Sequence, residues 1–174
     1  MIARLHRLAL SVYRRLPVWA RRRVVRTIAP SFTVGAMGFV ERDDGWLLLA
    51  RLSYRRRWGV PGGLLERGEA PADALVREVR EETGLAVQTV GEPAVVVDAE
   101  ARRVDVIFRA RLAPGQDPAA AAPGSPEILE VRWFSPDDLP ELQHETSGAL
   151  VALARSSRSP QAVPLPAHLE RRTD

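Results

Sequence analysis

The sequence of 174 residues contains no cysteine. This absence excludes disulfide bonds, thiolate metal sites and cysteine nucleophiles, and it fits a reducing compartment, so a cytoplasmic location is expected. No uninterrupted apolar run approaches the roughly 18 to 20 residues that a transmembrane helix needs. Hydrophobic residues make up 45% of the chain and charged residues 27%, which argues against a disordered or collagen-like protein. We therefore expect one folded domain with appendages.

Lysine is also absent, and all twenty-five basic residues are arginine. Residues 1–30 carry eight arginines and no acidic residue, whereas the remainder carries seventeen arginines and twenty-two acidic residues. Apolar residues recur at helical spacing up to Leu16, and a second helix is expected from Val18 to Ile28. We interpret residues 1–30 as a basic amphipathic helical extension that packs on the domain or on a second copy in a homodimer. The alternative is a weak contact with an anionic membrane surface or with RNA.

Beyond residue 31 the sequence alternates between strand and helix patterns. The Asp44-Gly45 pair predicts a hairpin, and Gly91 with Pro93 predicts a break within a later strand. The strongest helical pattern runs from 72 to 83. Aliphatic and β-branched runs predict strands over residues 32–41, 46–52, 85–97, 103–112 and 128–134. These elements are expected to build the main domain, over residues 31–155.

Three later segments complete the predicted organisation. The stretch 113–126 contains four prolines and four consecutive alanines, so it is interpreted as a low-complexity loop or a mobile flap. Ser135 at the N-cap and Pro136 at the first helical position predict a last helix that continues, with an interruption at Pro140, to about residue 154. Residues 156–174 are rich in serine, proline and arginine and are expected to form a disordered tail.

A cluster of glutamates on the helix at 72–83 is the feature most suggestive of chemistry. The apolar residues of this helix form one stripe toward the core, and Glu78, Glu81 and Glu82 share the flank beside it. Glu78 and Glu82 repel each other at i and i+4, and anions in the last turn oppose the helix dipole. A divalent cation would relieve both penalties, and hard carboxylate ligands favour Mg²⁺, with Mn²⁺ as a substitute. The alternative is a solvated helix in which Arg77 pairs with Glu81 and no metal binds.

These glutamates belong to a longer pattern that reads GLLERGEAPADALVREVREETGL over residues 63–85. The pattern places Gly63, Glu69, Arg77-Glu78, Glu81-Glu82 and Gly84 at fixed spacings, with aliphatic residues at 79 and 85. At every position it resembles the signature of the Nudix (MutT-type) hydrolases, and the flanking sequence extends the resemblance over about residues 32–155.

This resemblance implies an α/β fold, a Nudix-type α/β/α sandwich around a mixed β-sheet, to which residues 1–30 add a basic helical segment. It also implies Mg²⁺-dependent hydrolysis of a nucleoside diphosphate linked to another moiety. The motif makes Glu78, Glu81 and Glu82 the metal ligands, each of which could also help to activate water. Arg77 is expected to orient these glutamates by salt bridges, together with Glu69.

Residues outside the helix complete the predicted site. Glu127 is the candidate general base, because members of the family often carry a glutamate in the loop before a late strand; the alternative is ordinary surface charge. Arg51, Arg55, Arg56 and Arg57 lie just upstream of the glycine turn, and one of them is expected to bind phosphate or ribose, with Arg51 and Arg57 as the chosen candidates. Gly62 and Gly63 are expected to lie against the substrate.

The motif identifies the reaction and not the substrate, because loops outside the motif recognise the nucleobase and the second moiety of the substrate. Glu100 stands where a proline would suggest ADP-ribose, and Ala101 and Arg102 stand where a tyrosine would suggest diadenosine polyphosphates. By elimination we expect a MutT-like nucleoside triphosphate or nucleotide-derivative pyrophosphohydrolase that acts on a small nucleotide and releases a nucleoside monophosphate or a related product. The alternatives are a nucleotide-binding regulatory module without turnover, and an RNA 5′-end pyrophosphohydrolase that uses the basic N-terminus.

Overall fold

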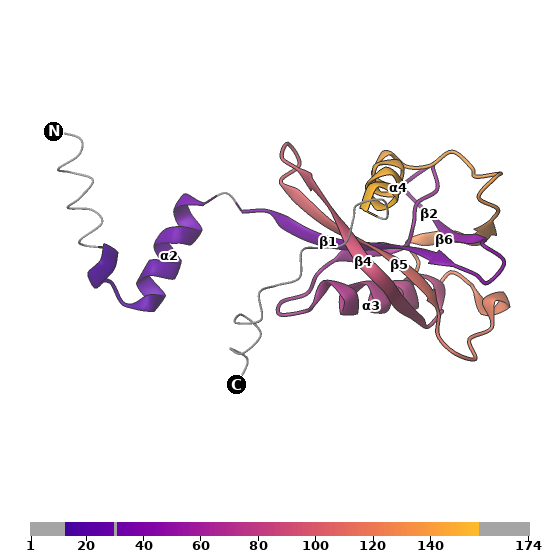
Figure 1. The fold of residues 1–174 in the computed structure, drawn as a ribbon, viewed down its shortest axis with the longest axis horizontal. Coiled ribbons are helices and arrows are strands. Elements are labelled where there is room, and N and C mark those ends of the chain that lie inside the picture. Colours follow the sequence, from indigo (N-terminus) through magenta and orange to yellow (C-terminus); the bar gives the residue numbers. More distant parts are fainter. Residues whose placement is uncertain (1–12, 30, 157–174) are drawn as a thin grey trace.

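The computed structural model of the chain describes residues 13–29 and 31–156. A mixed six-stranded sheet forms the centre of the domain, with one helix against each face (Figure 1). The elements follow the order α2 (Val18–Ile28), β1 (Thr33–Glu41), β2 (Leu47–Leu52), β3 (Gly62–Leu64), α3 (Pro71–Thr83), β4 (Val87–Asp98), β5 (Arg103–Leu112), the 3₁₀ turn η1 (Pro118–Ala120), β6 (Ile128–Phe134) and α4 (His144–Ser156).

The sheet has the strand order β4-β5-β1-β2-β6, and β3 pairs with β1 off this path. β1 and β5 run parallel over nine residue pairs, from Thr33 opposite Arg103 to Glu41 opposite Arg111. The other neighbouring pairs are antiparallel. Because β1 is the central strand and is covered on both faces, six consecutive residues from 35 to 40 are buried.

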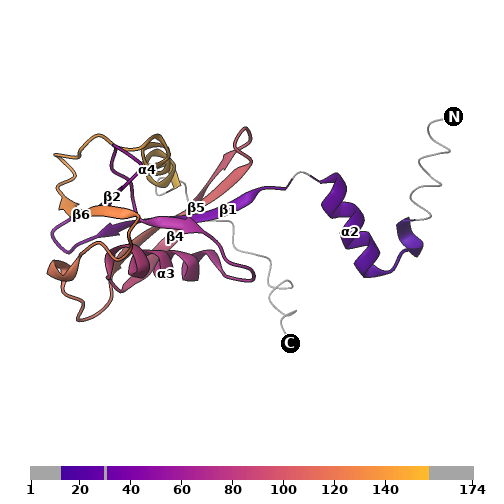
Figure 2. The same cartoon turned by 180° about the vertical axis from the view of Figure 1, so that it is seen from behind.

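Two apolar cores fill the space between the sheet and its helices. α3 packs over one face, where Leu75 and Val79 join Ala36 and Val40 of β1. α4 packs over the opposite face, where other residues of β1 and β5 surround Leu153. Figures 1 and 2 show α3 and α4 on opposite sides of the sheet in both views. The expected α/β/α sandwich is therefore confirmed.

Several predicted elements are confirmed, strand ends differ by one or two residues, and the predicted start of the last helix is wrong. α2 begins and ends at the expected residues, and β4 carries its expected irregularity as a register shift between Val90 and Ala94. The last helix, however, begins at His144 and not after Ser135. Ser135 instead accepts the backbone N–H groups of a tight turn, and residues 141–143 exchange backbone hydrogen bonds with Trp58. Pro140 disfavours helical backbone at Leu139, which would interrupt a helix begun at Ser135. The backbone bonds of residues 141–143 with Trp58 then occupy the chain up to His144, where the helix begins.

The stretch 113–126 makes specific contacts with the end of α3. The N–H of Ala122 donates to the Thr83 carbonyl at 3.1 Å, and that of Gly124 donates to the Glu82 carbonyl at 2.9 Å. No gap for a side chain exists at Gly124, because a Cβ there would overlap the Glu81 carbonyl. The loop thus supplies partners for carbonyl groups that the helix leaves unpaired at its C-terminus.

The basic N-terminal segment is described only in part. α2 lies apart from the sheet and joins β1 through a short connection (Figure 1), and Val18, Trp19 and Val25 are exposed on it. Residues 1–12, to which the first predicted helix mostly belongs, and the predicted tail from 157 onward lie outside the described residues. Among the helices of the described part, none has the length and apolarity needed to cross a bilayer. Packing on a second copy, and contact with a membrane or RNA, remain predictions for this segment.

Candidate active site

Helix α3 places the predicted glutamates beside the buried core. Pro71 occupies its first turn, and Gly84 ends it with a left-handed backbone at φ 73°. Leu75, Val79 and Thr83 are buried on the inner stripe. The neighbouring flank carries Glu78 and Glu82, which are partly buried, and Glu81, whose side chain is exposed.

Arg77 is the centre of an ion-pair network around this flank. Its Nε donates to Glu69 Oε1 at 2.9 Å and its Nη2 donates to Glu69 Oε2 at 3.0 Å, which forms a bidentate pair. Its Nη1 donates to Glu78 Oε1 at 2.8 Å and to Glu81 Oε2 at 3.3 Å. Nη2 also donates to the Leu64 carbonyl at 3.2 Å. Arg77 therefore connects the loop before α3 with two of the three predicted metal ligands.

Glu69 is held by donors on two sides. Besides the bidentate pair, the backbone N–H of Glu66 donates to Glu69 Oε2 at 2.8 Å. These hydrogen bonds, with that of Arg77 the larger cause, lower the pKa of Glu69 to about 2. Glu69 is thus an anion at neutral pH, and its two hydrogen bonds from Arg77 fix the position of the guanidinium.

Glu82 points away from Arg77 and into a cleft on the other side of the Gly62–Leu64 strand. Its Oε2 accepts the Gly62 backbone N–H at 3.2 Å. Burial raises the pKa of Glu82 to about 7, and the charges of Glu78, Glu127 and Glu81 contribute to this rise against the lowering effect of the Gly62 hydrogen bond. The carboxylate is therefore half-ionised near neutral pH and is surrounded by like charge.

The glycine pair allows the carboxylates to approach the backbone. A Cβ at Gly63 would overlap the carboxylate of Glu78, and a Cβ at Gly62 would overlap the Ala36 carbonyl of β1. Any side chain at position 63 would therefore displace Glu78. Both glycines line the cleft that Glu82 enters. Their contact with a substrate stays a prediction.

This cleft has a volume of about 230 Å³ and lies on the α4 face of the sheet. Its backbone wall is formed by residues 59–64, and its polar side chains come from four separate segments of the chain. They are Tyr54, Arg55, Glu82, Arg103, Gln143, Glu145 and Thr146. A cleft of this size holds part of a nucleotide rather than the whole molecule.

The two arginines proposed from the sequence have protein partners elsewhere. Arg51 Nη2 donates to Glu130 at 2.9 Å, and the Arg57 Nη2 lies 2.6 Å from Glu141 Oε1. The described residues that line the cleft include Arg55 and Arg103 but neither Arg51 nor Arg57. Sequence reasoning missed Arg103 because it lies 40 positions from Gly63, and only the parallel pairing of β5 with β1 brings it to the site.

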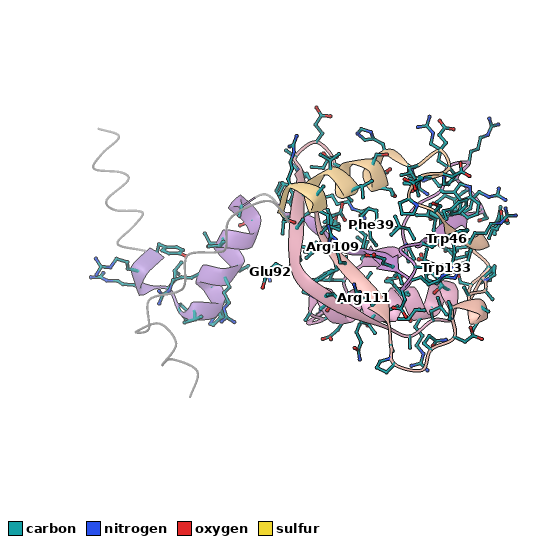
Figure 3. All side chains as sticks on the ribbon, turned by 45° about the vertical axis from the view of Figure 1, so that its right-hand side comes forward. Phe39, Trp46, Glu92, Arg109, Arg111 and Trp133 are labelled. Carbon is teal, nitrogen blue, oxygen red and sulfur yellow. The ribbon has the colours of Figure 1, made fainter. Side chains whose placement is uncertain are left out.

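The tryptophans near the motif serve the fold. The Trp58 ring meets Phe134 edge-on with 4.8 Å between centroids. Trp133 Nε1 donates to the Pro118 carbonyl at 2.9 Å, and the Arg42 guanidinium lies 5.5 Å from its ring centre. Figure 3 shows Trp46 and Trp133 close together at the β2–β6 edge, and Arg42 lies over the Trp46 ring as well. These rings and Arg42 stabilise that edge of the sheet.

Glu127 is exposed and lies in the loop that precedes β6. Its carbonyl accepts the Ser53 backbone N–H at 2.7 Å, which ties the two loops together. Its charge contributes to the raised pKa of Glu82, after burial as the larger cause. Four carboxylates thus share one electrostatic environment.

The donor set fits a hard divalent cation in chemistry and in charge. All candidate ligands are carboxylate oxygens, which suit a hard cation. The pKa of Glu82 is raised mainly by burial, and the charges of the neighbouring glutamates add to that rise. Within residues 13–29 and 31–156, no three acidic or histidine side chains converge closely enough to hold a cation as they stand. Glu78 and Glu81 instead accept hydrogen bonds from Arg77, whereas Glu82 accepts one from Gly62.

Comparison with known proteins gives consistent matches. The family model of the NUDIX domain matches residues 31–154. A MutT-like protein of Streptomyces ambofaciens is 34% identical over 119 residues, which cover 68% of this chain and 74% of that protein. A NUDIX hydrolase structure from Nitrosomonas europaea aligns with a TM-score of 0.63 and 25% identity, over 76% of this chain and 77% of that one. An ADP-ribose pyrophosphatase structure from Streptococcus suis 89-1591 aligns with a TM-score of 0.59 and 27% identity, over 75% and 96% respectively.

Proposed function

This chain belongs to the Nudix hydrolase family, and from that premise we propose that it hydrolyses a pyrophosphate bond in a nucleoside diphosphate linked to another moiety. Nudix hydrolases generally need divalent metal ions, and we propose Mg²⁺ for this chain, with Mn²⁺ as a substitute. Residues 31–155 form the catalytic domain in this proposal. The observation that supports it most is the Glu82 carboxylate, which enters the cleft beside Gly62 within reach of the charges of three other glutamates.

The proposed substrate is a nucleoside triphosphate or another small nucleotide derivative. The similar proteins differ in what their names say of their activity, since one is called MutT-like and another an ADP-ribose pyrophosphatase. The residues at 100–102 lack the markers of ADP-ribose and diadenosine polyphosphate hydrolases, which favours the MutT-like assignment. The products would be a nucleoside monophosphate and the remaining phosphorylated moiety.

Glu78, Glu81 and Glu82 would hold the cation in this proposal. When bound, Mg²⁺ neutralises charge on the phosphoryl oxygens and lowers the pKa of the attacking water. Glu78 and Glu81 would exchange bonds with Arg77 for bonds to the cation, while the bidentate pair with Glu69 keeps Arg77 in place. The Gly62 N–H fixes the Glu82 carboxylate at the entrance to the cleft.

Glu127 is proposed as the general base. Water attacks one phosphorus, the oxygen bridge to the leaving phosphoryl group breaks, and a carboxylate accepts the proton of the water. Glu127 lies outside the Arg77 network and is exposed, so its carboxylate is free of the ion pairs that hold Glu78 and Glu81. This leaves it able to move toward a bound substrate.

A substrate panel tests the proposal. Nucleoside triphosphates, nucleoside diphosphate sugars, dinucleotides and 5′-triphosphorylated RNA are incubated with Mg²⁺ or Mn²⁺, and the released monophosphates are separated by chromatography. We expect release by the wild type, a loss of at least roughly a hundredfold in Glu82→Gln, and no change in Glu100→Gln, which alters an exposed carboxylate in the β4–β5 turn. Binding of a nucleotide without release would support the regulatory-module alternative. Release from RNA alone would support the RNA 5′-end alternative.

A further inference from the structure

Arg103 is an unassigned cation that shares the cleft with Glu82. It is the first residue of β5, and its side chain lies on the α4 face of the sheet with those of Asp105 and Ile107. The cleft of about 230 Å³ is lined by Arg103, Glu82, Gly62 and Gly63. A single small ligand in this cleft therefore lies within reach of both the arginine and the glutamate.

Asp105 holds the Arg103 side chain in place through one nitrogen. Arg103 Nε donates to both carboxylate oxygens of Asp105, at 2.8 and 2.9 Å. Asp105 is only 9% exposed, so this pair is firmly packed. In the part of the chain that the structure describes, the two terminal nitrogens of Arg103 have no hydrogen-bond partner. The guanidinium is thus fixed at its base while its four outer N–H donors remain available.

Two glycines bring this guanidinium close to the backbone of the motif. A Cβ at Gly35 would lie 2.5 Å from Asp105 Oδ1, 3.0 Å from Arg103 Nη2 and 3.3 Å from the Gly63 carbonyl. The bare backbone of Gly35 therefore gives room for the Arg103–Asp105 pair beside Gly63. On another side Gly63 meets the Glu78 carboxylate, so the arginine and the predicted metal ligand border the same residue.

The carboxylates nearest Arg103 leave its terminal nitrogens open to a ligand, because Asp105 binds only Nε and Glu145 pairs with Arg55. Glu145 faces Arg103 across the cleft, and its own backbone N–H and the Arg55 guanidinium lower the pKa of Glu145, with a smaller effect from Arg103. Arg55 Nη1 lies 3.4 Å from Glu145 Oε1, so the charge of Arg55 offsets that of the Glu145 carboxylate. Asp105 accepts the hydrogen bonds of Arg103 Nε. The terminal nitrogens of Arg103 present the planar donor pattern that matches two phosphoryl oxygens.

We propose that Arg103 binds a phosphoryl group of the substrate through its terminal nitrogens, and that Asp105 is the positioning residue that holds it there. This inference rests on the proposed pyrophosphate hydrolysis. It identifies Arg103 as the positively charged side chain that shares the cleft with the Glu82 carboxylate. Arg103 would neutralise negative charge on the phosphoryl group from the β5 side of the cleft. The helix glutamates are anions and cannot supply this positive charge. The site is fitted to the linked phosphates, the part that all candidate substrates share.

Calorimetric titration of the full chain with inorganic pyrophosphate and with α,β-methylene-ATP, each in Mg²⁺, tests this assignment. The loss of charge-assisted hydrogen bonds in Arg103→Gln should weaken binding of both probes by roughly tenfold to a hundredfold. Arg103→Lys should recover part of the loss, since lysine keeps the charge without the planar donor pattern. Arg111→Gln, near the far end of the same strand and labelled in Figure 3, is the matched control and should bind as the wild type does.

Asp105→Asn tests the positioning role. It should weaken pyrophosphate binding in the wild-type background and have no further effect in the Arg103→Gln background, because its influence passes through the arginine. Equal weakening in both backgrounds would assign Asp105 a structural role instead and overturn that part of the proposal.

Three results would overturn the assignment of Arg103. These are unchanged binding of both probes in Arg103→Gln, weakened binding of the nucleotide alone, and no binding of pyrophosphate by the wild type. Weakening of the nucleotide alone would mean that Arg103 reads the base or sugar. Hydrolysis of the substrate panel by the same wild-type preparation would show that the proposed function survives any of these results.

Discussion

The backbone N–H of Gly62 donates a hydrogen bond to Glu82 Oε2 at 3.2 Å. This bond holds a carboxylate at the cleft although burial and three neighbouring glutamates disfavour its charge. In the metal-free protein the ionised Glu82 is therefore a source of instability. We expect function to require that charge, so stability and activity should respond in opposite directions when it is removed.

Glu82→Gln should stabilise the metal-free protein at alkaline pH. The folded-state pKa of about 7 lies above the ordinary value of 4.5, so the stabilising effect of a protonated Glu82 is present below pH 4.5 and is lost as the pH rises through 7. The neutral glutamine should raise the free energy of unfolding by about 1 to 3 kcal/mol at pH 8 and change it little at pH 4. Urea denaturation with EDTA at both pH values measures this. A gain of the same size at both pH values, or a matching gain in Glu100→Gln, would contradict the role of the Glu82 charge.

Binding of Mg²⁺ should release a proton near pH 6. Because burial and neighbouring carboxylates raise the pKa of Glu82 to about 7, a cation that uses this carboxylate must displace its proton below that pH. The apparent affinity should fall by up to about tenfold per pH unit below 7 and level off above it. Calorimetry at pH 6 in two buffers of different ionisation enthalpy counts the released protons. An affinity that is independent of pH between 5.5 and 8 would show that Glu82 is not a ligand.

Glu69→Gln should lower activity without removing any ligand. The bidentate bond between Glu69 and Arg77 anchors the guanidinium that contacts Glu78 and Glu81, and groups that orient metal ligands contribute roughly tenfold to a hundredfold to metal affinity or activity. Activity measured at several Mg²⁺ concentrations should show a higher Mg²⁺ requirement. Glu66→Gln is the control, because this neighbouring side chain is exposed and only its backbone N–H contacts Glu69. Equal effects of the two substitutions would refute the anchoring role.

Low pH should weaken the ion pair between Glu69 and Arg77. Hydrogen bonds from Arg77 and Glu66 lower the pKa of Glu69 to about 2, so its contribution to stability is present above pH 4.5 and is lost as the pH falls from 4.5 toward 2. The slope of unfolding free energy against pH in this range should be smaller in Glu69→Gln than in the wild type. Identical slopes would mean that the pair does not persist in solution.

Gly63→Ala should abolish activity, whereas Gly148→Ala should stabilise the protein. The new Cβ at position 63 would overlap the Glu78 carboxylate and displace a proposed metal ligand. Gly148 lies within α4 with open space around it, and alanine there should add up to about 1 kcal/mol of stability. Hydrolysis assays and thermal unfolding of both variants make the comparison. Retained activity in Gly63→Ala would mean that Glu78 need not lie against this glycine.

The sequence was most informative where spacing along one helix decides geometry. Glu78, Glu81 and Glu82 share a flank of α3 because of the helical period, and the network around Arg77 includes Glu69, Glu78 and Glu81 but not Glu82. The orientation of the side chains could not be read in this way. Glu82 turns toward Gly62 while Glu78 and Glu81 turn toward Arg77, and this difference depends on β3, which crosses beside the helix.

Features that depend on long-range pairing were not predictable from local patterns. Arg103 reaches the cleft because β5 pairs in parallel with β1 in a register that sets Asp105 beside Gly35. The start of α4 at His144 depends on backbone bonds between residues 141–143 and Trp58. The proline- and alanine-rich stretch has contacts at the end of α3 because Gly124 can approach the helix carbonyls. Each of these contacts joins segments that are distant in the chain.

Titration with Mn²⁺, followed by electron paramagnetic resonance of the free ion, tests the central claim most directly. We predict saturable binding by the wild type and by the control Glu100→Gln, and loss of that binding in the double variant Glu81→Gln/Glu82→Gln. Mg²⁺ should compete with the bound Mn²⁺. If the wild type takes up no ion, with or without pyrophosphate, or if the double variant binds as tightly as the wild type, then the glutamates of α3 do not form a metal site and the proposed mechanism is wrong.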